Sequence, residues 1–259
     1  MKADDRKGIV ENWLPRYTGM ELENYGRLIL LTNFYNYLEK FSRRFDAPIH
    51  GRGGPMQAAT NSKGITMINF GIGSPNAATI MDLLSAIKAE AVLFLGKCGG
   101  LKRRVEIGHF VLPIAAIRGE GTGLDYYPSE VPALPSFRLH NVIAQEIVKK
   151  GQDYRTGVVY TTNRRVWEWD KDFREYLRKI RAIGIDMETA TIFIVGHFNE
   201  IPRGALLLVS DTPMISDGIK TAEIDREVTM KYLDLHLEIG IATMESLMDS
   251  EEKVKHLRY

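Results

Sequence analysis

The sequence of 259 residues has little cysteine and no histidine pattern typical of metal sites. A single cysteine, Cys98, excludes an intramolecular disulfide framework and any metal cluster held by several cysteines. The six histidines show no His-x-x-x-His spacing, so we expect no metal and no cofactor. One unpaired cysteine fits a reducing compartment, and we expect a cytoplasmic protein.

Long apolar runs and an excess of charge of one sign are also missing. No run approaches the roughly 20 apolar residues that span a bilayer, and the segment Met1 to Glu11 is charged rather than apolar. We therefore expect neither export nor a membrane span. Lys and Arg number 34 against 33 Asp and Glu, a formal charge of +1, which gives no general attraction to nucleic acid or to an anionic membrane. An anionic ligand would need a local cationic pocket.

Short apolar runs alternate with stretches that favour helices. Runs of about 4 to 8 apolar residues bounded by Gly, Asn, Asp or Ser are typical of strands buried on both faces of a sheet. These runs are Leu28 to Leu31, Ile65 to Phe70, Ala91 to Leu95, Phe110 to Ile114, Gly157 to Tyr160 and Ala205 to Val209. The helices expected between them are Ala77 to Glu90, Ser136 to Lys150, Lys171 to Lys179, Thr189 to Asn199 and Val228 to Met248.

This alternation predicts an α/β fold over residues 1 to 259. We expect a single domain in which helices cover both faces of a central mixed, mostly parallel sheet, as a three-layer α/β/α sandwich. The segment Gly119 to Pro135 is the longest one without a predicted element, and loops of this length are often lids or interface elements.

Ligands of open α/β sheets bind beyond the carboxyl ends of the strands. Two Gly-rich segments follow such ends. In Gly71 to Ala78 the glycines, Gly73 among them, allow close backbone approach before a helix start that offers N–H groups to an anion, although a simple tight turn explains them equally well. In Gly96 to Leu101, Lys97 would sit in a Gly-rich turn that cradles phosphate, or be a solvated turn lysine. Cys98 beside it is better explained as a packing residue than as a thiol nucleophile.

Carboxylates follow two further strand ends. Asp186 and Glu188 precede an apolar helix. Burying both carboxylates costs free energy unless a ligand, such as a sugar through its hydroxyls, binds them. The alternative is that one of them caps the N-terminus of that helix. Asp211 follows Ala205 to Val209, where partial burial favours a general acid, whereas a turn-forming Asp before Thr212 is the alternative.

The ordered set of motifs resembles the nucleoside phosphorylase and nucleosidase superfamily, and within it the AMP nucleosidase branch. The motifs are Arg16-Tyr17-Thr18-Gly19, Leu30-Leu31-Thr32-Asn33-Phe34, Gly73-Ser74-Pro75-Asn76-Ala77, Cys98-Gly99-Gly100-Leu101, Thr156-Gly157-Val158-Val159, Ile185-Asp186-Met187-Glu188 and Val209-Ser210-Asp211. Compared with the longer members of that branch, we expect this chain to lack their N-terminal regulatory domain. A second departure is Lys97, where relatives carry other polar residues.

The resemblance implies hydrolysis of AMP to adenine and ribose 5-phosphate. It implies that Asp211 protonates or hydrogen-bonds N7 of the purine, that Glu188 holds the ribose hydroxyls, and that Met187 packs against the sugar. Trp167 would stack on the base, and Trp169 is the second candidate for this role. Alternatively, both tryptophans simply belong to the core. Further substrate-binding residues implied by the motifs are Asp186, Cys98, Gly99, Ser210, Gly73 and Asn33.

Several points stay open in the sequence. Candidate cations for the 5′-phosphate are Lys97, Arg43, Arg44, Arg164 and Arg165; Lys97 instead matches the place where phosphorolytic relatives hold inorganic phosphate. The resemblance implies a homo-hexamer whose subunits complete one another's sites. A purine nucleoside phosphorylase and a non-catalytic purine-binding protein are the rival functions.

Overall fold

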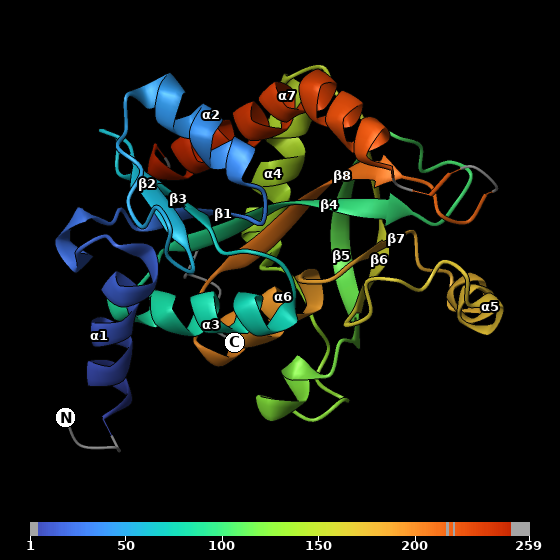
Figure 1. The fold of residues 1–259 in the computed structure, drawn as a ribbon, viewed down its shortest axis with the longest axis horizontal. Coiled ribbons are helices and arrows are strands. Elements are labelled where there is room, and N and C mark those ends of the chain that lie inside the picture. The colour runs from blue at the N-terminus through green and yellow to red at the C-terminus, as the bar shows by residue number, and fades with distance from the viewer. Residues whose placement is uncertain (1–4, 216–217, 220, 250–259) are drawn as a thin grey trace.

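The computed structural model describes residues 5–215, 218–219 and 221–249, and within these ranges a central sheet lies between two layers of helices (Figure 1). The predicted α/β/α sandwich is therefore confirmed. The sheet of the described residues has eight strands: β1 (Leu28–Thr32), β2 (Gln57–Thr60), β3 (Ile65–Asn69), β4 (Ala91–Gly100), β5 (Phe110–Gly119), β6 (Tyr154–Thr162), β7 (Gly184–Asp186) and β8 (Arg203–Asp211).

The sheet is mixed and mostly parallel, as predicted. Parallel pairs join β1 to β3 and β4, β4 to β8, and β6 to β5 and β7, whereas β2–β3, β4–β7 and β5–β8 are antiparallel. The sequence did not predict that β4, β7, β6, β5 and β8 pair in a closed ring. This closure brings the end of β4 against both β7 and β8, and so gathers the ends of distant strands.

Helices cover the two faces of the sheet. One face packs against α1 (Arg6–Thr18), α3 (Ser74–Leu83) and α6 (Thr189–Phe198), and the other against α2 (Tyr35–Phe45), α4 (Phe137–Lys149) and α7 (Ala222–Met248). Apolar residues of β8 alternate between these faces: Leu207 and Val209 join the first core, while Leu206 and Leu208 join the second. None of the helices in the described ranges is long and apolar enough to cross a membrane.

Several predicted boundaries are wrong. The strands predicted over Phe110 to Ile114 and Gly157 to Tyr160 are the longer β5 and β6, which end at Gly119 and Thr162 and pair with each other along their length. The strand predicted to end at Leu95 continues as β4 to Gly100, because β7 and β8 both pair with its last residues. The helix predicted over Ala77 to Glu90 is α3 followed by a 3₁₀ turn, Leu84–Ile87. Helix α7 begins at Ala222, not at Val228, because Thr221 caps it through a side chain that accepts from the Ile224 N–H.

The remaining elements are short or lie near the molecular edge. Helix α5 (Lys171–Lys179) matches its prediction. The 3₁₀ turns Leu22–Asn24 and Thr122–Asp125 were not predicted; the second lies inside the long segment Gly119 to Pro135. The guanidinium of Arg118 organises that segment, because it donates to the backbone carbonyls of Tyr127, Pro128 and Val131.

Candidate active site

A pocket of about 130 Å³ lies where six strands end. Its walls combine residues that follow β1, β3 and β7 with the last residues of β4, β6 and β8 and with the segment between β6 and α5. The lining residues are Asn33, Phe34, Ile72, Lys97, Cys98, Gly99, Thr162, Arg164, Arg165, Trp167, Glu168, Ile185, Asp186, Met187, Glu188, Ser210 and Asp211. The pocket therefore unites segments that are far apart in the sequence at the strand ends, where such folds bind ligands.

Glu188 is buried and held by backbone amides from two segments. One carboxylate oxygen accepts from the Gly73 N–H at 2.7 Å, and the other from the Met187 N–H at 3.2 Å. Gly73 has φ 96°, a backbone conformation that a side chain would oppose, and this conformation directs its N–H toward Glu188. The glycine turn thus orients a pocket carboxylate rather than an anionic ligand.

Asp186 lies two residues away but serves the backbone. Its Oδ1 accepts from the Thr161 hydroxyl at 2.7 Å, and its Oδ2 accepts from the Thr189 hydroxyl and from the N–H groups of Thr189, at 2.7 Å, and Glu188, at 3.3 Å. Glu188 is the N-cap residue of α6 but makes no capping bond with its own side chain, and the Asp186 carboxylate accepts the N–H groups of Glu188 and Thr189 in its place. Both residues line the pocket, and Glu188 is the one whose carboxylate is not used to cap the helix.

Burial controls the protonation of this carboxyl pair. Desolvation and the nearby Asp186 carboxylate raise the pKa of Glu188 to about 7, against the lowering effect of its hydrogen bonds to Gly73, Met187 and Asn33. Burial also raises the pKa of Asp186, and the hydrogen bonds from Thr189 and Thr161 oppose that rise. Two buried carboxylates this close resist carrying two full charges, so a partner that offers positive charge or hydroxyl donors is favoured here.

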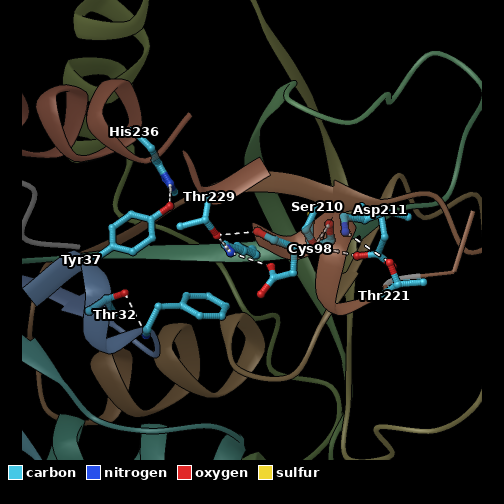
Figure 2. A network of polar contacts seen from close by, with 12 residues as sticks. Thr32, Tyr37, Cys98, Ser210, Asp211, Thr221, Thr229 and His236 are labelled. Atoms are coloured by element: carbon cyan, nitrogen blue, oxygen red, sulfur yellow. Dashed lines mark hydrogen bonds and ion pairs between the residues drawn. The ribbon is translucent and has the colours of Figure 1, made fainter. Parts of the chain in front are cut away.

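Asp211 ends β8 and is buried beside Ser210. The Ser210 hydroxyl donates to Asp211 Oδ1 at 2.6 Å, which fixes the orientation of the carboxyl group (Figure 2). The pairing of β4 with β8 shifts register here: Val209 is opposite Cys98 and Asp211 is opposite Gly99, so Ser210 is an extra residue. The carboxylate is placed by a buried strand rather than by a turn.

Cys98 and Gly99 form the floor of the pocket. Cys98 is 2% exposed and belongs to the core cluster, which agrees with its interpretation as a packing residue. A Cβ on Gly99 would lie 3.0 Å from Pro213 and 3.2 Å from Ile185, so glycine permits the close approach of the segments after β8 and in β7. The expected Gly-rich turn at Gly96 to Leu101 is therefore wrong: Gly96 to Gly100 belong to β4, and Lys97, Cys98 and Gly99 line the pocket from it.

Lys97 is neither a turn lysine nor part of an amide cradle. Its ammonium is buried and donates to Asp225 Oδ1 and to Thr229 Oγ1, both at 2.7 Å. The ring of Phe34 covers it, with the ring centre 4.4 Å from Nζ. Figure 2 shows Thr229 of α7 facing β4. Lys97 does line the pocket, but with its charge matched by the protein.

The segment between β6 and α5 forms another wall. Trp167 is buried, lines the pocket and packs edge-on against Phe173, whereas Trp169 is 72% exposed and does not line it. Arg164 pairs with Asp170 at 2.7 Å, and Arg165 pairs with Glu168 at 3.2 Å. Both arginines are substantially exposed at the pocket, where a ligand can compete for them.

Comparison with known proteins agrees with this arrangement. The family model of the phosphorylase superfamily matches residues 18–240. The chain belongs to the phosphorylase superfamily. It is 29% identical to AMP nucleosidase of Escherichia coli K12 over 90% of this chain, and it spans 57% of the length of that relative.

Two solved structures of the superfamily resemble this one. A crystal structure of AMP nucleosidase from Bacteroides thetaiotaomicron has a TM-score of 0.85 and 51% identity, covering 94% of this chain and 98% of that chain. The uridine phosphorylase structure from Vibrio fischeri, at 20% identity and a TM-score of 0.78 over 87% and 93% of the two chains, shares the fold. The resemblance inferred from the motifs, in both superfamily and branch, is confirmed.

Within this superfamily fold, two of the candidate cations lie away from the pocket. Arg43 and Arg44 are on the exposed side of α2, near Glu39 and Glu238 respectively, and neither lines the pocket of this chain. The prediction that they hold a phosphate is not supported within one subunit, because α2 turns its apolar side to the core and its arginines outward.

Sequence reasoning missed several lining residues, namely Phe34, Ile72, Thr162, Glu168 and Ile185. Phe34 stands in a motif that was recognised, next to Asn33. Thr162 ends β6, and the rule that directed attention to other strand ends would also have found it. Asn33 does line the pocket, and its buried side-chain oxygen has no hydrogen-bond partner among the residues that the structure describes, so it offers a ligand an acceptor.

Proposed function

We propose that this protein hydrolyses the N-glycosidic bond of AMP to give adenine and ribose 5-phosphate. The observation that carries the proposal is the presence of Asp211 and Glu188 in one pocket of a chain that is 51% identical to an AMP nucleosidase over 94% of its length. Cleavage of this bond builds positive charge on the ribose and negative charge on the leaving base, so it needs a carboxylate at one end and a proton donor at the other.

Glu188 suits the ribose end. Its two oxygens are oriented by the Gly73 and Met187 amides, and each oxygen has a further lone pair for a sugar hydroxyl. Binding of the 2′- and 3′-hydroxyls would satisfy a buried carboxylate whose ionisation burial opposes, and its charge would stabilise the ribosyl cation. Met187 offers a soft apolar contact to the sugar.

Asp211 suits the base end. The Ser210 hydroxyl holds one of its oxygens, so the carboxyl group can present a proton or a strong hydrogen bond to N7 in a fixed direction. Adenine then leaves as a neutral base. Trp167, on the segment between β6 and α5, offers the indole face or edge that pairs with a purine.

The 5′-phosphate would bind to Arg164 and Arg165, the exposed cations of the pocket. An arginine can exchange a carboxylate partner for a phosphate because both accept its forked N–H groups. A homo-hexamer in the cytoplasm, in which a neighbouring subunit adds further cations, remains part of the proposal.

The test is a product analysis with AMP, adenosine, GMP and IMP, each with and without inorganic phosphate. Adenine and ribose 5-phosphate from AMP without added phosphate are the expected products. Ribose 1-phosphate from adenosine, formed only with phosphate, would instead establish a nucleoside phosphorylase. Purine binding without release of any base would establish a binding protein.

A further inference from the structure

Lys97 is the buried cation of the pocket wall. Its side chain is 2% exposed, whereas those of Arg164 and Arg165, the other two cations that line the pocket, are 42% and 58% exposed. A buried ammonium beside a ligand pocket is a strong point of attraction for an anion, because little water competes for it.

The protein itself supplies the anion for this ammonium. Asp225 and Thr229 lie one turn apart on α7 and both accept from Lys97 Nζ at 2.7 Å. The Thr229 hydroxyl also donates to the backbone carbonyl of Asp225 at 2.6 Å, so the two partners form one unit on the helix. The Phe34 ring also contacts the ammonium. The charge of Lys97 is thus matched before any ligand enters.

This arrangement discriminates between charged and neutral nucleophiles. A phosphate dianion drawn to Lys97 would have to displace the Asp225 carboxylate or lie next to it, and two anions at one cation repel each other. Water carries no charge and meets no such repulsion.

We infer that Asp225 decides which nucleophile this pocket accepts: by holding Lys97 it excludes inorganic phosphate and leaves attack on C1′ to water. The inference rests on the proposed cleavage of AMP. With water, the C1′–N9 bond breaks, a C1′–O bond forms, and the proton that water loses balances the proton that adenine gains. With phosphate, a phosphate oxygen forms the C1′–O bond, the phosphate loses the proton, and the products are adenine and ribose 1,5-bisphosphate.

Binding of inorganic phosphate tests the inference without turnover. Isothermal titration calorimetry of the full chain should show that Asp225→Asn binds phosphate about tenfold or more tightly than the wild type, as expected when a like charge a few ångströms from a bound dianion is removed. Thr229→Val is the matched control: it removes a partner of Lys97 but keeps both charges, and should give no such gain. The double variant Lys97→Met/Asp225→Asn should lose the gain.

Product analysis adds a second measurement. Asp225→Asn with AMP and phosphate should form ribose 1,5-bisphosphate, which the wild type does not form. Unchanged phosphate affinity in Asp225→Asn, or a gain that survives in the double variant, overturns the inference. Asp225→Ser gives the same comparison if Asp225→Asn does not fold. Absence of AMP cleavage by the wild type contradicts the proposed function alone, because the calorimetric result does not depend on turnover.

Discussion

The hydroxyl of Ser74 donates to the backbone carbonyl of Met187 at 2.6 Å. Together with the bond from the Gly73 N–H to Glu188, this contact ties the start of α3 to the turn that precedes α6. The carboxylate proposed to hold ribose is therefore oriented by a segment more than one hundred residues earlier in the chain, and not only by its own helix. Its orientation should survive a change that preserves hydrogen-bond acceptors.

Glu188→Gln should abolish turnover of AMP and leave the fold intact. The amide oxygen keeps one of the two backbone N–H donors, its NH2 group cannot accept from the other, and the charge that stabilises the ribosyl cation is lost. Base release from AMP, with circular dichroism of the same preparation, checks both statements. Near-normal turnover would exclude the proposed role of Glu188.

The same variant should also change how stability depends on pH. The pKa of Glu188 is raised by burial from an ordinary value of 4.5 to about 7 in the folded protein. Between these values the native state keeps a proton that the unfolded state has released, so wild-type stability falls as pH rises. Glutamine does not titrate, so the free energy of unfolding of Glu188→Gln does not fall in this way. Its free energy of unfolding relative to that of the wild type should therefore rise from pH 4.5 to pH 7 in denaturant titrations. A constant difference across this range would contradict the raised pKa.

Asp211→Asn should lower the rate with AMP by about 10²–10⁴-fold, the usual effect of losing a general acid. Asparagine can donate a hydrogen bond but cannot transfer a proton to N7. A nitrophenyl riboside 5-phosphate, whose leaving group needs no proton, should lose much less activity in the same variant. The control is Asp153→Asn, the same change at an exposed carboxylate. Equal losses with both substrates would make Asp211 a positioning residue.

Asp186→Ala should destabilise the protein by about 1–3 kcal/mol, because it leaves buried donors of Thr161 and Thr189 without an acceptor. Urea unfolding measures this change. Asp172→Ala, at an exposed position in the first turn of α5, should cost no more than about 0.5 kcal/mol. If Asp186→Ala were as stable as that control, Asp186 would not act as the cap of α6.

The double variant Arg164→Gln/Arg165→Gln should raise the KM for AMP by about tenfold or more, the usual effect of losing hydrogen bonds to a charged group, and change that for adenosine little. Arg43→Gln/Arg44→Gln makes the same change of charge away from the pocket and is the matched control. An equal rise for AMP and adenosine would exclude Arg164 and Arg165 as phosphate ligands. A selective rise for AMP in the control would assign the phosphate to Arg43 and Arg44 of a neighbouring subunit.

The apolar strand runs were readable from the sequence, and so were Asp211 and Glu188, because buried strands are continuously apolar and a carboxylate directly after one is conspicuous. The ends of β4 and β5 were not, because both strands continue past their apolar runs to Gly100 and Gly119. The partners of Lys97 were not, since Asp225 lies 128 residues away and the polar first turns of α7 gave no apolar period to read. Helix α1 was missed because Pro15 lies inside it, and most of its side chains are polar.

The extra residue Ser210, opposite no residue of β4, has a consequence for the lengths that this chain can tolerate. Deleting Ser210 would remove the bulge but leave Asp211 opposite Gly99, so the carboxylate would stay at the strand end and lose the hydroxyl that donates to its Oδ1. Inserting a residue between Val209 and Asp211 would have to enlarge the bulge or move Asp211 past Gly99. Variation in length is therefore expected after Asp211, in the connection to α7, more than before it. An otherwise well-folded homologue with one residue fewer at this point would keep the carboxylate and lose the hydroxyl that orients it.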